Sequence, residues 1–335
     1  MQNPVSGPVP AADAILVTGL TVAYQSKAGW LQAVRDVSFD LKSGEILAIV
    51  GETGSGKSST AAAMIRMLPS NGRVEAGQVF FEGKNLLELP EREMRRLRGE
   101  SIAYVPQQPT SAFNPTMTVG RQVAEPLLIH RGMKYKEAAP EAARRLREMG
   151  VHEVARVMRS YPHELSGGML QRAMIATAMI CEPSLIIADE PTSALDVTIQ
   201  RQILKLIKDV QRTYRLALLL ISHDLKVVSQ IADRILVLYG GRAAEIGPTE
   251  AIINRPRHPY TRGLLASTMA AEVAHKGKLA SLAGYPPNPI EVDREPGCPF
   301  RPRCPRAVDD CSVSFPAETG DRNHHWSCYN PEPTP

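Results

Sequence analysis

Eight residues of this sequence, Gly51–Ser58, have the types and the spacing needed to bind a phosphate chain. They read Gly-Glu-Thr-Gly-Ser-Gly-Lys-Ser between the apolar run Ile46–Val50 and the segment Ser59–Ile65, which predicts a strand, a glycine-rich loop and a helix. The glycines let successive backbone N–H groups and the positive end of the helix face one anion. We expect Lys57 to reach the β- and γ-phosphates and Ser58 to bind Mg²⁺. A glycine-rich turn that binds nothing is disfavoured, because the match is full-length and lies between a strand and a helix.

Two adjacent carboxylates, Asp189 and Glu190, follow the apolar run at 185–188. Open α/β sheets bind ligands at the carboxyl ends of their strands, so we expect both side chains beside the phosphates. Asp189 would hold Mg²⁺, directly or through water, and Glu190 would polarise the attacking water. An acidic loop after a strand is common when seen alone, but the upstream phosphate-binding loop argues against that interpretation here.

Three further features indicate a binding site only in combination with the phosphate-binding loop and the two carboxylates. Ser166 and Gly167 open a helix and so offer a second anion-binding end, although a capping serine before glycines is common for structural reasons. His223 follows the apolar run at 216–221 and is placed to sense a γ-phosphate, although a single such histidine is more often structural. Tyr24 ends an N-terminal strand-like run and could stack on a base, although packing is the commoner role.

Length and composition limit the class of protein. A chain of 335 residues suits two domains, or one large domain with an appendage, and its 43% hydrophobic content is ordinary for a globular protein. The longest apolar runs are far shorter than a bilayer span, and residues 1–14 lack the features of a secretory signal. The net charge of +4 is too small to indicate nucleic acid by itself. We expect a cytoplasmic protein with a flexible tail at residues 1–13.

The elements that position these residues follow from the apolar pattern. Runs at 15–24, 31–41 and 77–82 predict an antiparallel β layer beside the strand before the phosphate-binding loop. Helical spacing over 119–159 predicts an α-helical insert, placed at about 110–165, in an α/β core. The remaining elements expected are a helix at 90–99, a strand at 101–105, a loop at 106–115, a helix at 200–214, and strands at 216–221 and 234–239.

Four of the five cysteines lie near the C-terminus with the spacing C-x₅-C-x₆-C-x₁₆-C: Cys298, Cys304, Cys311 and Cys328. In a chain without an export signal, such a cluster indicates a metal more often than disulfides. Thiolates suit an iron–sulfur cluster or zinc, and the absence of the C-x₂-C pairs of zinc ribbons favours the cluster; binding no metal is the third option. His324 and His325 are alternative ligands, or else surface residues beside Trp326. Cys181 is expected to be a buried small hydrophobe.

In this order, the motifs resemble those of the ATP-binding subunit of an ABC transporter over residues 15–250: the P-loop, the signature at 165–169, the Walker B strand that ends at Asp189-Glu190, and the switch histidine His223. The resemblance implies an α/β fold with an ABC-type P-loop ATPase core, that is, a RecA-like sheet plus an antiparallel β layer. A helical insert and a small Cys/Pro-rich C-terminal module complete it. The implied domains are a nucleotide-binding domain at 14–255 and an oligopeptide-importer-type regulatory or metal module at 256–335.

The resemblance also assigns roles. Glu190 and His223 would be the catalytic residues, and Gln107 would be the Q-loop glutamine, which contacts Mg²⁺ and faces the membrane subunit. ATP would be sandwiched head to tail between two such chains, so that the signature binds the γ-phosphate held by the opposite subunit. The implied ATP-binding residues are Tyr24, Gly51, Glu52, Thr53, Gly54, Ser55, Gly56, Lys57, Ser58, Ser59, Gln107, Ser166, Gly167, Gly168 and Asp196. The implied Mg²⁺ ligands are Ser58, Gln107 and Asp189.

One departure from the general pattern and one further motif indicate a branch of the family. The fifth signature residue is Met169 instead of glutamine, and His258-Pro259-Tyr260-Thr261 is typical of oligopeptide/dipeptide importer ATPases. Some members of this branch carry a [4Fe–4S] cluster on four such cysteines, with Zn²⁺ as the alternative here. The resemblance implies an ATP-hydrolysing motor of an importer for di- or oligopeptides or related solutes, at the cytoplasmic face of the inner (plasma) membrane. Its partners would be a homologous ATPase subunit in a heterodimer, two permease subunits and, indirectly, an extracytoplasmic solute-binding protein.

Two other functions agree less well with the sequence. A soluble ABC ATPase that acts on nucleic acid or ribosomes, with a zinc-binding module, would commonly carry two cassettes or long coiled coils. This sequence has one cassette and no heptads, and its basic residues are scattered, so no nucleic-acid partner is expected. A P-loop kinase of small molecules is disfavoured because the signature at 165–169 would have no role in it.

Overall fold

The computed structural model describes residues 13–27, 29–193, 195–273, 284–287, 292, 296–321 and 323–333. The predicted tail at 1–13 lies outside these residues except for Asp13, with which the first strand begins. The chain divides into two compact units: the first comprises 1–42, 47–89 and 222–335, and the second comprises 43–46 and 90–221. The predicted division at 255/256 stays a prediction.

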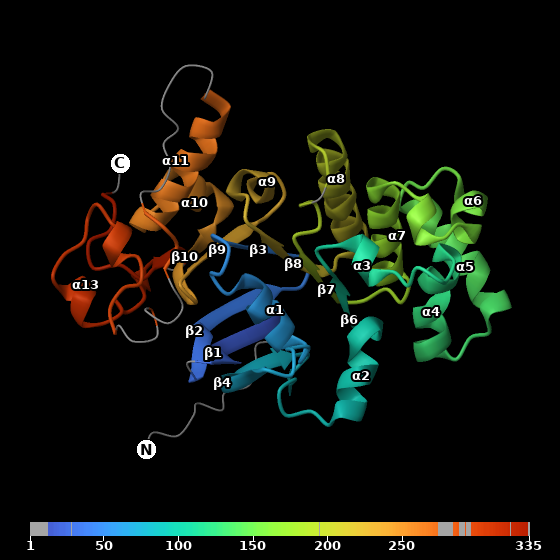
Figure 1. Cartoon of the computed structure of the whole chain (residues 1–335), viewed down its shortest axis with the longest axis horizontal. Helices are drawn as coiled ribbons and strands as arrows, with labels where there is room; N and C mark the ends of the chain where they lie inside the picture. Colours follow the sequence, from blue (N-terminus) through green and yellow to red (C-terminus); the bar gives the residue numbers. More distant parts are fainter. Residues whose placement is uncertain are drawn as a thin grey trace. The chain divides into compact units, whose positions relative to one another are not determined.

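The antiparallel layer expected from the sequence lies in the first unit, with the strand order β2-β1-β4-β5 (Figure 1). Its long strands are β1 (Asp13–Ser26), β2 (Gly29–Lys42) and β4 (Gly72–Phe81), and β5 (Lys84–Asn85) is short. β1 pairs antiparallel with both β2 and β4. β4 begins five residues before the predicted start at Gly77. These first residues were not predicted as a strand because they are mostly exposed and form no apolar run.

A second sheet of the first unit carries the phosphate-binding loop. Its strand order is β11-β12-β10-β9-β3, and β3 and β9 are parallel. The strands are β3 (Ile46–Val50), β9 (Arg234–Tyr239), β10 (Arg242–Pro248), β11 (Thr319–Gly320) and β12 (His325–Trp326). The described residues that follow α11, from 284 to 333, are called the C-terminal segment, and because β12 pairs with β10 this segment extends the sheet. The helices of the unit are α1 (Lys57–Met64), α9 (Leu225–Ser229), α10 (Thr249–Asn254), α11 (Pro259–Val273), η2 (Arg301–Arg303) and α13 (Asp310–Val313).

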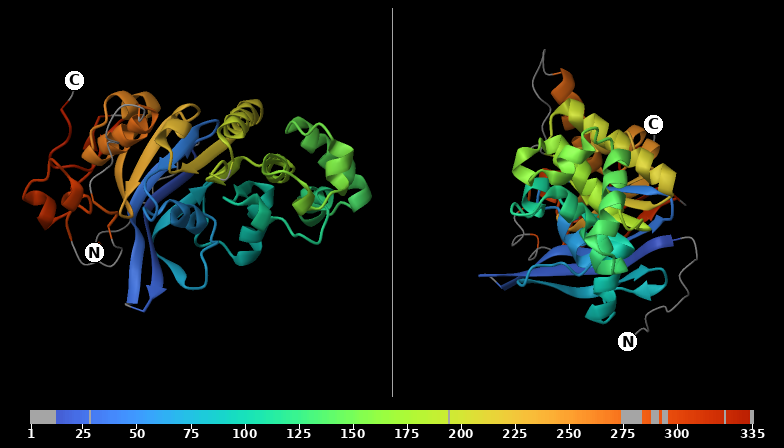
Figure 2. Two further views of the ribbon diagram at one scale, coloured as in Figure 1. Left: turned by 45° about the horizontal axis from the view of Figure 1, so that its top comes forward. Right: turned by 90° about the vertical axis from the view of Figure 1, so that its right-hand side faces the viewer.

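The second unit has a parallel sheet in which β7 (Leu185–Asp189) pairs with β6 (Ile102–Val105) and β8 (Ala217–Ser222). Its helices are α2 (Glu91–Glu100), α3 (Pro109–Ala112), α4 (Val119–Arg131), α5 (Tyr135–Glu148), α6 (Val154–Arg159), η1 (Pro162–Glu164), α7 (Gly167–Met179) and α8 (Val197–Tyr214). The green helices α4, α5 and α6 pack together, as the helical pattern predicts (Figure 2). The proline-rich loop contains one helical turn, α3, that the sequence analysis missed; Pro109 stands at its N-terminus, where a missing N–H costs nothing.

The described helices include none that is both long and apolar enough to cross a membrane. Cys181 is 4% exposed, which confirms its expected burial.

Candidate nucleotide-binding site

The P-loop connects the fully buried strand β3 to α1, as the sequence predicts. Gly56 has φ of +100°, and a Cβ atom at this position would lie 2.6 Å from the carbonyl oxygen of Ala33. Gly51 is equally constrained, because its Cβ would lie 2.2 Å from the carbonyl oxygen of Leu238. Both glycines therefore let the loop curl closely against neighbouring backbone.

The interior of the P-loop carries groups that suit an anion. Lys57 is only 6% exposed, and its Nζ donates hydrogen bonds to the carbonyl oxygens of Gly51 (2.8 Å) and Glu52 (3.0 Å). The buried hydroxyl of Ser55 has no hydrogen-bond partner among the described residues. An ammonium group and an unsatisfied hydroxyl in a loop of this shape fit a phosphate chain.

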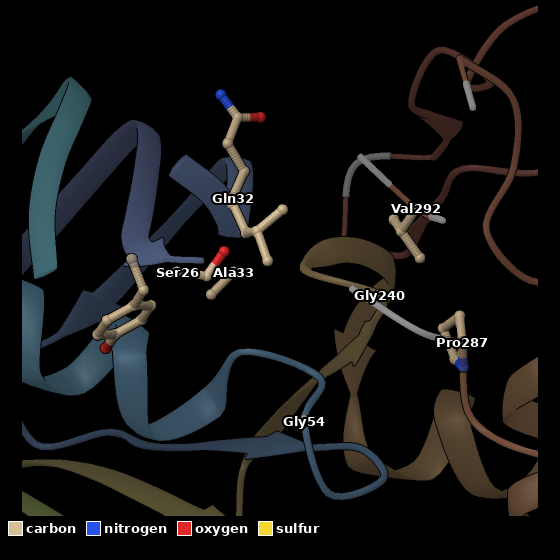
Figure 3. Close-up of a pocket in the computed structure, with 9 residues that line it drawn as sticks. Ser26, Gln32, Ala33, Gly54, Gly240, Pro287 and Val292 are labelled. Carbon is tan, nitrogen blue, oxygen red and sulfur yellow. The ribbon is translucent and has the colours of Figure 1, made fainter. Parts of the chain in front are cut away.

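A cavity of about 220 Å³ lies in the same unit, next to Tyr24. Its lining includes Gln32 and Ala33 of β2 on one side and Pro287 and Val292 of the C-terminal segment on the other (Figure 3). The hydroxyl of Tyr24 donates to Ser59 Oγ (3.0 Å), which ties this aromatic ring to α1. The cavity is mostly apolar and therefore offers surroundings that suit a planar base.

The acidic pair lies at the carboxyl end of β7, in the second unit. Asp189 is 6% exposed and accepts a hydrogen bond from the hydroxyl of Tyr104 on β6 (3.0 Å). The pKa of Tyr104 is raised mainly by burial and further by the charge of Asp189. This hydroxyl therefore stays a hydrogen-bond donor. Tyr104 was not predicted as a site residue from the sequence. Its position in a strand that pairs with β7 is the one signal that could have found it.

Gln107 and Glu190, which the sequence analysis selected separately, are brought together. Gln107 Nε2 donates to Glu190 Oε2 at 2.9 Å. The backbone N–H of Glu190 donates to the carbonyl oxygen of Ile221 on β8 (2.9 Å), which fixes the turn that follows β7. These hydrogen bonds hold the carboxylate of Glu190 at the end of β7, the position at which we expect the general base.

The signature and the D-loop aspartate both begin helices of the second unit. Ser166 is the N-cap of α7, and its hydroxyl accepts the N–H of Met169 (3.4 Å). Asp196 is the N-cap of α8, and its carboxylate accepts the N–H groups of Thr198 and Ile199, each at 3.0 Å. These contacts give both residues a structural role, and their roles toward a nucleotide stay predictions.

His223 is exposed and lies in the first unit, immediately after β8 and before Asp224, the N-cap of α9. Its position after a buried strand agrees with the expected element order. Its role toward the γ-phosphate stays a prediction.

The four C-terminal cysteines are free thiols that influence one another. Burial, together with the nearby thiols, raises the pKa of Cys298 to about 12 and that of Cys328 to about 11. Across the part of the chain that the structure describes, no three His, Cys, Asp or Glu side chains are close enough to hold one metal ion. Thiolates are suitable metal ligands, but the described side chains do not come close enough together to hold one ion. The expected metal site is therefore not confirmed.

His324 is buried instead of lying at the surface. It is 8% exposed, and its Nε2 lies 2.7 Å from Glu245 Oε1 on β10. The ring of His325 is half-exposed, and its Nδ1 lies 3.5 Å from Glu318. Each ring thus lies beside a carboxylate of its own.

Comparison with known proteins shows the family to which the chain belongs. The ABC transporter family model matches residues 34–193, and the model of the oligopeptide/dipeptide transporter C-terminal region matches residues 244–311. The chain is 42% identical to the oligopeptide transport ATP-binding protein OppD of Salmonella typhimurium, over 98% of this chain and 97% of the relative. It is 45% identical to the dipeptide transport ATP-binding protein DppD of Bacillus subtilis, over 92% of each.

A solved structure supports the fold. The dimeric, post-hydrolysis state of the ATP-binding cassette MJ0796, bound to ADP and Pi, matches 70% of this chain and 98% of that one, with a TM-score of 0.63 and 27% identity. None of these proteins is named for action on nucleic acid or ribosomes. The chain belongs to the ATP-binding subunits of ABC transporters, in the branch that carries the oligopeptide/dipeptide transporter C-terminal region, and its site is that of an ATPase coupled to transport.

Proposed function

We propose that this chain is the ATP-hydrolysing motor of an ABC importer for di- or oligopeptides. The observation that carries the proposal is the combination of a P-loop with Glu190 held at a strand end by Gln107. Near full-length identity of 42–45% to proteins named for oligopeptide and dipeptide transport supports the substrate class.

The proposed roles follow the chemistry of each group. Lys57 binds the β- and γ-phosphates, Tyr24 stacks on adenine, and Glu190 accepts a proton from the attacking water. His223 contacts the γ-phosphate, and Asp196 belongs to the same site. Ser58, Gln107 and Asp189 offer oxygen ligands to Mg²⁺, which when bound neutralises the charge of the phosphate chain.

The proposed assembly contains a second ATPase subunit, two membrane permeases and, indirectly, an extracytoplasmic solute-binding protein. The signature residues Ser166, Gly167 and Gly168 would bind the nucleotide held by the partner ATPase subunit, which we propose is a homologous chain in a heterodimer. The complex would place this subunit at the cytoplasmic face of the inner membrane.

Reconstitution tests the substrate class. The subunit would be assembled with its permeases, partner ATPase and binding protein in liposomes that contain MgATP, and uptake of a radiolabelled tripeptide would be compared with uptake of Ni²⁺. Peptide uptake that disappears with Lys57→Ala is expected. Uptake of Ni²⁺ but not of the peptide would contradict the proposed substrate while leaving the motor intact.

We also propose that Cys298, Cys304, Cys311 and Cys328 bind a [4Fe–4S] cluster, with Zn²⁺ as the alternative. Four cysteines in one sequence segment that lacks the C-x₂-C pairs of zinc ribbons support this, because thiolates are the ligands of such clusters. Iron and zinc would be quantified on anaerobically purified protein, together with the visible absorption spectrum. Brown, iron-loaded protein that bleaches in Cys311→Ser is expected; one zinc per colourless chain would favour the alternative, and protein without metal would contradict both.

A further inference from the structure

The acidic residue of the P-loop, Glu52, is held from outside the loop by Arg303 of the C-terminal segment. Arg303 Nη1 donates to Glu52 Oε2 at 2.7 Å, and Nη2 donates to Oε1 at 3.0 Å. The side chains of Arg303 and Glu52 are 6% and 22% exposed, respectively. A bidentate pair that is shielded from water fixes both position and orientation, as a single surface ion pair does not.

The backbone of Glu52 has a second anchor, which comes from α11. Its N–H donates to the hydroxyl oxygen of Tyr260 at 2.9 Å. Tyr260 is fully buried, and its ring centroid lies 4.4 Å from that of Tyr239 and 5.4 Å from that of Phe300. Arg303 Nη1 also donates to the hydroxyl of Tyr239 (3.1 Å), so one aromatic cluster supports both anchors.

Glu52 is directly connected to the phosphate-binding group. Its carbonyl oxygen accepts a hydrogen bond from Lys57 Nζ at 3.0 Å. A carboxylate without a partner at this position would repel the phosphate chain of a nucleotide, because like charges that are partly removed from water interact strongly. The guanidinium of Arg303 compensates this charge. Arg303 was not predicted from the sequence, since 251 residues separate it from Glu52.

We propose that Arg303 is a positioning residue for the P-loop, which neutralises and orients Glu52 so that the loop can bind MgATP. This proposal rests on the proposed nucleotide-binding function. Tyr260 completes the arrangement by holding the backbone of Glu52. The C-terminal segment thus contributes to nucleotide affinity in its own chain.

The test is MgATP affinity of the full chain, measured by titration with the fluorescent analogue mant-ATP in the presence of Mg²⁺ and by competition with ATP. Arg303→Ala is expected to weaken binding about 10-fold, because the carboxylate of Glu52 then lacks its compensating charge. The double variant Arg303→Ala/Glu52→Gln is expected to bind more tightly than Arg303→Ala, because the uncompensated charge is gone. Arg303→Lys is expected to lie between Arg303→Ala and the wild type.

A second readout separates positioning from a general loss of structure. In the assembled transporter, Arg303→Ala is expected to raise KM for ATP about 10-fold while kcat changes less than about 3-fold, since the proposed catalytic base is intact. Arg262→Ala is the matched control. It breaks an ion pair with Glu332 (2.6 Å) that joins α11 to the C-terminal segment instead of to the P-loop, and its affinity for mant-ATP is expected to be unchanged.

Three results would overturn the proposal. These are a folded Arg303→Ala that binds like the wild type, a double variant as weak as Arg303→Ala, and an equal loss in Arg262→Ala. If Arg303→Ala does not fold, Tyr260→Phe decides: about 3-fold weaker binding supports the proposal, and unchanged binding overturns it. A wild-type chain that binds no mant-ATP would instead overturn the proposed nucleotide-binding function itself.

Discussion

At the scale of single residues, the backbone of Glu190 has a conformation that is uncommon for residues other than glycine. Its φ is +46°, in the left-handed region that is unfavourable for a residue with a Cβ atom. The hydrogen bonds from its backbone N–H to Ile221 and from Gln107 to its carboxylate hold it there. Strain of this kind persists where the surrounding structure imposes it, and here it directs a carboxylate outward from a buried strand.

Glu190→Gln should therefore separate nucleotide binding from hydrolysis. Glutamine keeps the size of the side chain but cannot accept a proton, so we expect MgATP binding within about 2-fold of the wild type. ATP turnover should fall by about 10²–10⁴-fold, as is typical when a general base is lost. A phosphate-release assay on the assembled transporter measures this. Substantial turnover in the variant would disprove the assignment of the base.

His258 should make stability depend on pH. It is 3% exposed, and burial outweighs the opposing charge of Glu245, so its pKa falls to about 4. Between the ordinary histidine pKa of about 6.5 and pH 4, the unfolded chain binds a proton that the folded chain excludes. The stabilisation is therefore complete above pH 6.5, and about 3 kcal/mol is lost as the pH falls toward 4.

His258→Asn provides the comparison, because the asparagine oxygen can still accept the N–H of Tyr260 that His258 Nδ1 accepts at 3.1 Å. Urea unfolding of both proteins at pH 7.5 and pH 4.5 gives the two changes in free energy. We expect the wild type to lose more stability than the variant, by about 2.5 kcal/mol. Equal losses would show that His258 does not exclude a proton in the folded state.

At the scale of elements, local patterns were predictable and long-range contacts were not. The P-loop, β7 and α7 were predicted from the sequence, because glycine spacing, apolar runs and a capping serine act within a few residues. The contact of Tyr104 with Asp189 and that of Arg303 with Glu52 join residues far apart in the chain, so no local pattern marks them. Asp196 shows a third case: its motif was recognised, but its role as the N-cap of α8 was not.

The helix α5 contains a buried charge whose removal should destabilise the second unit. Arg145 is fully buried and donates to Glu148 (2.9 Å), to Glu182 (2.8 Å) and to the hydroxyl of Tyr214. Arg145→Ala should cost about 2 kcal/mol of stability, less than for a wholly buried pair, because the carboxylates remain partly exposed. Urea unfolding measures this loss.

The adjacent Arg144 is the control for that loss. It also pairs with carboxylates of α5 but is 44% exposed, so Arg144→Ala should change stability by no more than about 0.5 kcal/mol. Equal losses of stability in the two variants would mean that the burial of Arg145 does not increase its contribution to stability.

At the scale of the whole molecule, the residues proposed to act on ATP are divided between the two units. The P-loop, Tyr24 and His223 belong to the first unit, whereas the acidic pair and the signature belong to the second. The C-terminal segment belongs to the first unit because β12 pairs with β10 and Arg303 contacts Glu52. The module implied at 256–335 stays a prediction, and its pairing with β10 could not be predicted, since proline and cysteine content reveals composition but not pairing partners.

This division leads to a final prediction, that binding and turnover respond separately to changes in the two units. Ser166→Glu places a carboxylate at the N-terminus of α7, where the proposed function requires the γ-phosphate held by the partner subunit, and like charges repel. We expect mant-ATP to bind the isolated chain within about 2-fold of the wild type, while ATP turnover of the assembled transporter falls about 10²-fold. Ser166→Ala, which loses only the helix cap, should keep most of the turnover. Weaker mant-ATP binding by the isolated Ser166→Glu chain would show that the signature acts on its own subunit's nucleotide, and full turnover would remove it from the site altogether.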